Sequence, residues 1–212
     1  MARSRLSKDD HLRIAAAIRA AETRTAGEIF CVVAHASAGY FLPAVASLSV
    51  ALLLVSLGAA FVLEAWWISI RLPWFVALQV LAFTAGLLVL WLAPGLRVYL
   101  VPRPIQFRAA HDNAMRQFLA RNVHITSERT GVLLFVSLAE RYAEVIADAG
   151  IDRVVPERTW DGIVAGLVAE ARAGRIADGF IGAIATIGDL LAVHFPVSPL
   201  DRNELDDHVI EI

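Results

Sequence analysis

The residues best suited to chemistry are carboxylates in the second half of the chain. Asp148 and Asp152 flank a glycine-containing segment, and Glu140 precedes them. Carboxylate oxygens are the ligands that Ca²⁺ and Mg²⁺ prefer, so this segment is a candidate cation site with Asp148 and Asp152 as metal ligands. The spacing lacks the ordered pattern of a calcium loop, however. It favours the alternative that these acids cap the next helix or pair with Arg141 and Arg153 on a solvated surface.

Other signatures of catalysis or metal binding are missing from the sequence. It contains no GxxxxGKS/T phosphate loop and no GxGxxG, HExxH or GxSxG motif. The single cysteine, Cys31, excludes a disulfide framework within the chain, and we expect it to be a small buried hydrophobe. The six histidines show no paired ligand spacing, so we expect individual surface or hydrogen-bonded residues: His11, His35, His111, His124, His194 and His208.

The elements that would position these side chains follow from the hydrophobic pattern. Helices are predicted for four segments: residues 7–24, 104–122, 157–173 and 178–194. Strands are predicted for residues 29–34, 131–137 and 142–147, although a helix competes for the last. A loop is expected at residues 148–152 and an extended acidic tail at residues 201–212. Short apolar strands mixed with amphipathic helices are typical of layered α/β or α+β domains.

The apolar residues are concentrated in the middle of the chain. Apolar types make up 58% of the 212 residues and charged types only 19%, which excludes a disordered chain and argues against an ordinary soluble enzyme. Residues 36–63 and 72–96 contain no Asp, Glu, Lys or Arg. Because about 20 apolar residues cross a bilayer, we predict membrane spans at about residues 41–63 and 73–92. The alternative, two core helices, would need more surrounding protein than this chain supplies.

The charges around the two predicted spans indicate their orientation. The spans are joined by a short segment, so they form a hairpin and the regions that flank it lie on the same side. Only Arg71 among basic residues lies in that segment, whereas four arginines follow the second span: Arg97, Arg103, Arg108 and Arg116. Because positive charge favours the inner side, we expect a multi-pass protein of the cell inner (plasma) membrane with both terminal segments in the cytoplasm.

Several motifs in the flanking regions resemble the TPM-domain family. They are Gly27-Glu28-Ile29, the GVLLFVSLAER run at residues 131–141, the IADAGI run at residues 146–151, and Trp160. The resemblance implies a three-layer α/β/α sandwich of Rossmann-like type. It also implies acid phosphatase activity, sometimes with bound Ca²⁺. Carried over to this chain, the acidic site would contain Glu140, Asp148 and Asp152, with Glu28 and Arg141 nearby.

The residues and the resemblance together predict an α/β domain that is split by a transmembrane helical hairpin. Residues 1–40 and 101–212 form the TPM-like domain, and residues 41–100 form the hairpin. We expect a binding, modulating or quality-control module for membrane complexes, and the alternative is an acid phosphatase assisted by Ca²⁺ or Mg²⁺. The expected partners are the lipid bilayer and other membrane proteins. With 19 basic and 21 acidic residues, the composition gives no reason to expect nucleic acid.

Overall fold

The computed structural model describes residues 6–126, 129–156, 158–197 and 207–212. The chain divides into two compact units. The first, called here the α/β unit, consists of Met1–Ser37 and Phe107–Ile212. The second, called the hairpin unit, consists of Ala38–Gln106. The two segments of the α/β unit are therefore separated in the sequence by the whole hairpin unit.

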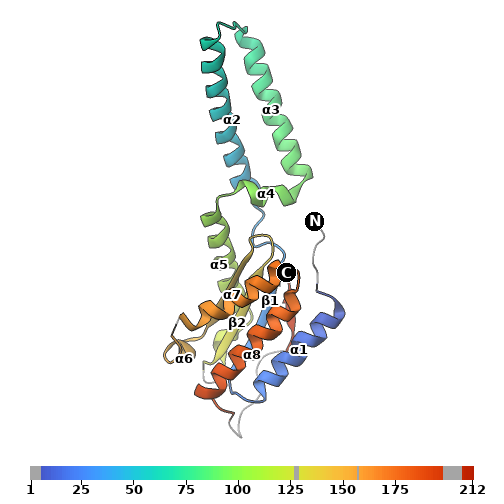
Figure 1. Ribbon diagram of the computed structural model, residues 1–212, viewed down its shortest axis with the longest axis vertical. Coiled ribbons are helices and arrows are strands. Elements are labelled where there is room, and N and C mark those ends of the chain that lie inside the picture. Colours follow the sequence, from blue (N-terminus) through green and yellow to red (C-terminus); the bar gives the residue numbers. More distant parts are fainter. Residues whose placement is uncertain (1–5, 127–128, 157, 198–206) are drawn as a thin grey trace. The chain divides into compact units, whose positions relative to one another are not determined.

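A four-stranded sheet forms the centre of the α/β unit (Figure 1). Its strands are β1 (Glu28–Ala34), β2 (Gly131–Ser137), β3 (Tyr142–Ala147) and β4 (Val209–Glu211), in the order β3-β2-β1-β4. β1 is parallel to β2 and to β4, whereas β3 is antiparallel to β2. Every residue of β1 and β2 is buried, as their continuous apolar sequences require.

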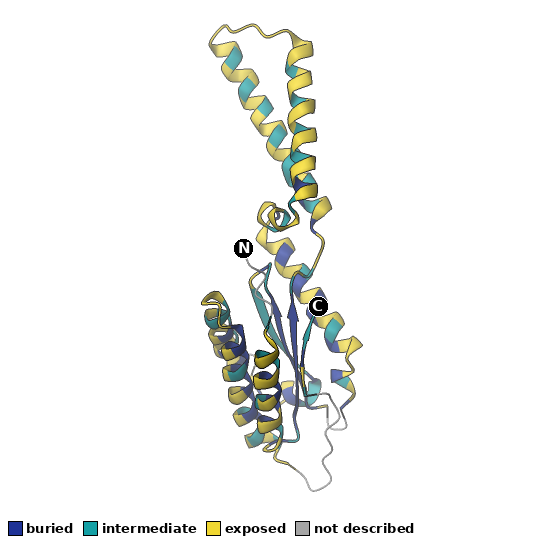
Figure 2. Ribbon diagram, turned by 90° about the vertical axis from the view of Figure 1, so that its right-hand side faces the viewer, coloured by how far each residue is buried: buried dark blue, intermediate teal, exposed yellow. Residues whose placement is uncertain are grey.

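Helices cover both faces of this sheet (Figure 2). One face carries α1 (Lys8–Glu22), α7 (Arg158–Arg172) and α8 (Ile176–His194), which pack on Ile29, Cys31 and Val33 of β1. The other face carries the part of α5 (Arg103–Ala120) around Ala114 and Phe118, which packs on the alternate β1 residues, Phe30 and Val32. The alternation follows from the two-residue period of a strand, and it gives the sheet an apolar core on each side.

The α/β class predicted from the sequence is confirmed, with two local corrections. The segment expected to be a loop contains the short helix α6 (Ala149–Asp152), because the side chain of Asp148 caps its first turn. The tail expected to be extended and acidic ends in β4, because Val209 and Ile210 place apolar side chains in the two cores. The expected elements at residues 157 and 201–206 lie outside the described residues. The short 3₁₀ helix η1 (Val123–Ile125) follows α5.

The hairpin unit contains two long apolar helices, α2 (Phe41–Ala65) and α3 (Leu72–Leu92), and the short helix α4 (Pro94–Leu100). Ala44 is the buried residue of α2, and Leu90 is that of α3. The two helices approach closely at Gly86, where an added Cβ would lie 2.8 Å from the side chain of Leu48. Among the described residues, α2, α3 and α8 are long and apolar enough to cross a membrane. That any of them crosses one stays a prediction.

The first residue of β2 fits only without a side chain. A Cβ added to Gly131 would lie 2.1 Å from the carbonyl oxygen of Val123, a backbone atom that cannot move aside cheaply. We expect Gly131→Ala to lower the free energy of unfolding by about 1–3 kcal/mol, the usual range for overpacking. Gly162, in α7, has open space at the same position and is the matched control.

Gly162→Ala should instead raise the free energy of unfolding, by about 0.5–1 kcal/mol, because alanine favours a helix over the unfolded chain. Thermal and denaturant unfolding of the detergent-purified chain measure both variants. Equal unfolding midpoints for the two variants would contradict the close packing at Gly131.

Candidate functional site

The topology of the sheet gathers side chains from distant parts of the sequence at one edge. β1, β2 and β4 are parallel, so their carboxyl ends share that edge. β2, the next strand along the chain, pairs with one edge of β1, and β4, the last strand, pairs with its other edge. In open α/β sheets, the carboxyl ends of strands at such a reversal of order are the usual place for a ligand. This edge is therefore the first place to look for a functional site.

Glu140 lies at this edge, in the turn between β2 and β3. Its side chain is fully buried. One carboxylate oxygen accepts a hydrogen bond from the backbone N–H of Ser37 at 2.9 Å, and the other accepts one from the Ser137 hydroxyl, which also lies 2.8 Å from that of Ser37. Ser137 is also fully buried, whereas Ser37 is partly exposed, and this group joins the end of β1 to the end of β2.

Asp148 lies at the opposite edge of the sheet. Its backbone N–H donates to the carbonyl oxygen of Gly131, the first residue of β2. Its carboxylate is buried and accepts a hydrogen bond from the N–H of Ala149 at 2.6 Å and two-pronged contacts from the guanidinium of Arg129 at 2.9–3.2 Å. The hydrogen bond from the Arg129 guanidinium to Asp148 raises the pKa of Arg129. Arg129 adopts a left-handed backbone conformation, which non-glycine residues rarely do.

The structure thus brings together two of the three predicted site residues. Asp148 and Asp152 lie one turn apart at the two ends of α6, and the N–H of Asp152 donates to the carbonyl oxygen of Asp148. Glu140 is separated from both by the length of β3, roughly 20 Å at about 3.3 Å per residue. Glu28 starts β1 opposite Gly131, at the Asp148 edge, whereas Arg141 lies beside Glu140.

The acidic residues do not fit a Ca²⁺ or Mg²⁺ site as they stand. A hard cation needs about six oxygen ligands, and the Asp148 carboxylate is already neutralised by Arg129. Within the described residues, no three His, Cys, Asp or Glu side chains are placed to hold a metal ion. The role of Asp148 and Asp152 as metal ligands therefore stays a prediction, and what their surroundings explain is capping and ion pairing.

A cluster that the sequence does not reveal lies at the carboxyl edge. Glu211, at the end of β4, receives His11 of α1 at 3.0 Å and His35, which follows β1, at 3.4 Å, both through Nε2. The backbone N–H of Leu6 donates to the same carboxylate at 3.1 Å. All three side chains are partly exposed, so this cluster is open to water and to protons. His11 and Glu211 are 200 residues apart, and the packing of α1 on the sheet together with the pairing of β4 with β1 brings the three side chains together.

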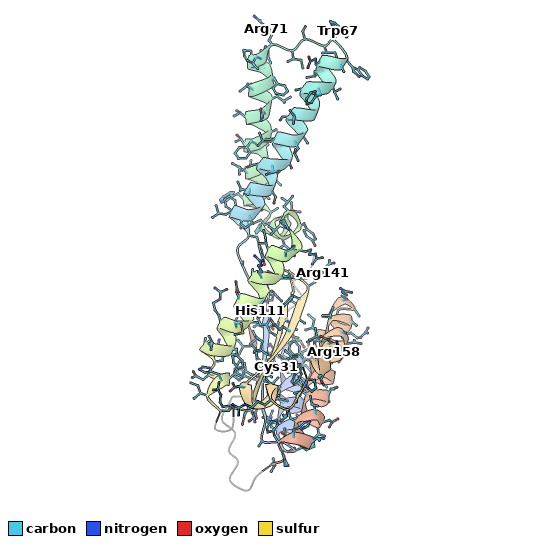
Figure 3. All side chains as sticks on the ribbon, turned by 90° about the vertical axis from the view of Figure 1, so that its left-hand side faces the viewer. Cys31, Trp67, Arg71, His111, Arg141 and Arg158 are labelled. Carbon is cyan, nitrogen blue, oxygen red and sulfur yellow. The ribbon has the colours of Figure 1, made fainter. Side chains whose placement is uncertain are left out.

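A second histidine–carboxylate pair connects α5 with β3. His111 Nδ1 lies 2.8 Å from Glu144, and the Tyr142 hydroxyl donates to the same carboxylate at 3.1 Å. Burial raises the pKa of Tyr142, and the charge of Glu144 adds to the effect. His111 projects from α5 in Figure 3 and is half exposed. His11, His35 and His111 are therefore all held by carboxylates, which spacing along the sequence could not indicate.

Cys31 takes no part in these groups. It is fully buried in β1, inside the α/β unit (Figure 3), and burial raises the pKa of its thiol. The prediction that it is a small buried hydrophobe is confirmed.

Comparison with known proteins places this geometry among relatives. The NMR structure of the BA42 protein from the psychrophilic bacterium Bizionia argentinensis is similar to this chain with a TM-score of 0.60 and 19% sequence identity. The similarity covers 98% of this chain and 95% of that one, and at this identity it shows the fold alone. No curated protein matches the chain. Residues 95–190, which begin in α4 and end in α8, match the TPM domain. The resemblance of this chain to the TPM-domain family is therefore confirmed over these residues.

Proposed function

We propose that the protein is a membrane-anchored TPM-domain protein whose α/β unit binds and modulates membrane complexes. The proposal is carried by one observation, the apolar surface of α2 and α3. Side chains such as Leu53, Leu54 and Leu81 are more than half exposed, and they recur on every side of both helices. In water such a surface would aggregate, whereas in a bilayer it is solvated by lipid. On this proposal the unit is a three-layer α/β/α sandwich interrupted by a membrane hairpin.

The third apolar helix, α8, has a different role in this proposal. Half of its most apolar window is buried, and its buried residues include Phe180, Ile184 and Ile187, which lie in the core between α8 and the sheet. The same window of α2 has no buried residue. The composition of a helix does not distinguish a core helix from a membrane span, whereas its burial within the protein does. We therefore propose that α2 and α3 cross the membrane and that α8 does not.

The ends of the hairpin have the side chains expected at a membrane surface. Trp67 and Trp74 are exposed near the joining segment, and Trp91 and Tyr99 are exposed near the other end. Arg97 donates to the carbonyl oxygen of Leu90 at 2.9 Å, and its guanidinium lies 5.2 Å from the centre of the Phe41 ring. Arg97 thus supplies a donor to the C-terminal end of α3 and holds the start of α2 beside it. Aromatic and basic residues of this kind anchor spans at interfaces.

Two features support a cytoplasmic, membrane-bound binding module. The arginines that follow α3 outnumber Arg71, the basic residue of the joining segment, which favours the inner side for the α/β unit. Only residues 35–40 connect β1 to α2, so an anchored α/β unit would be confined to the membrane surface. Such confinement raises its effective concentration toward other membrane proteins, and these are the partners that we propose.

Paired lysine substitutions test whether α2 and α3 cross a membrane. Leu54→Lys/Leu81→Lys places a charge in each helix, and we expect loss of the chain from carbonate-washed membranes. A charge at the centre of a span costs about 2.5–3.5 kcal/mol. Leu12→Lys/Val193→Lys alters side chains of α1 and α8 that are at least as exposed, 67% and 76% against 64% and 65%. This control should stay in the membrane fraction, and equal behaviour of the two variants would contradict the proposal.

Cysteine labelling tests the orientation. Cys31 is fully buried, so the wild-type chain should give little background. Trp67→Cys lies in the joining segment and Arg158→Cys at the start of α7, and both positions are exposed (Figure 3). We expect a membrane-impermeant maleimide to label Trp67→Cys in intact cells and Arg158→Cys only after lysis. The reverse pattern would place the α/β unit outside the cytoplasm.

The alternative function is phosphate-ester hydrolysis, which the TPM resemblance implies. The observation in its favour is the cluster of His11, His35 and Glu211 at the carboxyl edge, the usual position of a site in an α/β sheet. Its imidazoles are general acid–base groups that water can reach.

Hydrolysis assays separate the two functions. The detergent-purified chain is given a phosphate monoester with and without Ca²⁺ or Mg²⁺, beside Asp148→Asn/Asp152→Asn. On the binding-module proposal we expect no cation-dependent hydrolysis in either protein. Hydrolysis that needs the cation would establish the phosphatase alternative. Its loss in a variant whose unfolding midpoint matches that of the wild type would identify the two aspartates as ligands.

A further inference from the structure

The C-terminal segment 207–212, which contains β4, is held to the rest of the α/β unit by ionisable side chains at both ends. Between them, β4 makes only a three-residue ladder with β1. Two further backbone hydrogen bonds extend it, from the N–H of Ile212 to Val33 at 2.9 Å and from the N–H of His35 to Ile212 at 2.8 Å. A strand this short adds little on its own, so the side chains at its ends decide how firmly the segment is docked.

At the carboxyl end, Glu211 is the acceptor for His11 and His35. Each contact is an ion pair only when the imidazole is protonated. Asp10, which precedes His11 in α1, is the other carboxylate near that ring, and it is itself bound to the backbone N–H of Ser7. Loss of a proton from either imidazole would therefore remove positive charge beside Glu211 and weaken this end.

At the other end, Asp207 lies against Glu22, the last residue of α1. The N–H of Ile29 donates to Glu22 Oε1 at 3.0 Å, whereas Oε2 is buried and receives no hydrogen bond from the described residues. Burial raises the pKa of Glu22 to about 8, against the hydrogen bond from Ile29, and the negative charges of Glu28 and Asp207 add to the rise. A protonated Glu22 is able to share its proton with Asp207, whereas an ionised Glu22 repels it.

Loss of protons weakens the docking of segment 207–212 at both of its ends. A carboxyl group whose pKa is raised on docking stabilises the docked state below its ordinary pKa of 4.5, and this contribution is lost as pH rises to about 8. Asp207 also faces Arg19, whose Nε lies 3.9 Å from it and whose side chain is mostly exposed.

We propose that segment 207–212 is a proton-controlled latch, which is docked on α1 and β1 in mildly acidic conditions and released as pH rises. Release removes β4 from the edge of β1 and frees the N–H of His35, whereas the carbonyl oxygen of His35 keeps its hydrogen bond from the N–H of Ala139. The latch does not depend on the proposed membrane anchoring or on catalysis, because its groups all lie within the α/β unit.

Amide hydrogen exchange of the full-length chain in detergent tests the latch. The amides of His35 and Ile212 report on docking, and the amide of Asp148, bonded to Gly131, reports on the β2–β3 half of the sheet. We expect the protection factors of His35 and Ile212 to fall between pH 5 and 8, by at most about tenfold per pH unit, the limit for one proton, because opening separates Asp207 from Glu22 and so lowers the pKa of Glu22. The protection factor of Asp148 should change much less.

Variants separate the latch from general unfolding. Glu22→Gln cannot ionise, so it should flatten the pH dependence at Ile212, and Glu211→Gln should remove the part due to the two histidines. Glu170→Gln, which alters a surface ion pair with Arg175, is the matched control and should behave as wild type. A parallel fall at Ile212 and Asp148, or an unchanged profile in both Glu22→Gln and Glu211→Gln, would overturn the proposal. If Glu22→Gln perturbs folding, the Asp148 amide detects it, and His11→Gln then provides the test.

Discussion

The structure depends on β1, a buried strand that needs another strand hydrogen-bonded to each of its edges and helices packed on both of its faces. Its seven residues are all buried, and its backbone is paired with β2 on one side and with β4 on the other. Both partners come from the second segment of the α/β unit, beyond the hairpin unit in the sequence. An unpaired, apolar central strand would be unstable and prone to aggregation, so the hairpin has to return the chain to the place where it left. Two helices of 25 and 21 residues joined by a short segment satisfy that requirement, whereas a single helix would not.

The parts of the fold that could be predicted from the sequence are those that burial determines locally. The runs at residues 29–34 and 131–137 are apolar without interruption, which predicts strands covered on both sides, and the sheet confirms it. β4 could not be found in this way, because it has two apolar residues in three and depends on pairing with a strand 178 positions earlier, as at Cys31 and Val209. The helix α6 was missed for a related reason. A single turn has no periodicity, and only the cap at Asp148 marks its start.

The same distinction applies to the candidate site. The sequence identified Glu140, Asp148 and Asp152 by residue type and by resemblance. In the structure, Glu140 and Asp148 are buried and their carboxylates accept hydrogen bonds. A buried carboxylate that is paired and hydrogen-bonded joins chain segments together, and removing one partner is strongly destabilising because a charge is left without compensation. Loss of function in a variant of Glu140 or Asp148 would therefore reflect lost structure as readily as lost chemistry. The partly exposed groups around Glu211 and His111 depend on contacts between distant segments, and no local pattern predicts them.

The position of the latch gives it a consequence beyond its own segment. The backbone of His35 is bonded to Ile212, and three residues later the chain enters the hairpin unit. Ser37, between them, is held by Glu140, which does not leave the core. Two of the bonds that fix the exit of β1 do not involve β4: the N–H of Ser37 donates to Glu140, and the N–H of Ala139 donates to the carbonyl oxygen of His35. Undocking of β4 would free the N–H of His35 while the sheet and Ser37 stay in place, because β1 keeps its full ladder with β2. A change in pH would in this way alter the edge of β1 and the start of the connection to α2 without unfolding the domain. The segments that move in regulation are drawn from the least stable parts of a structure.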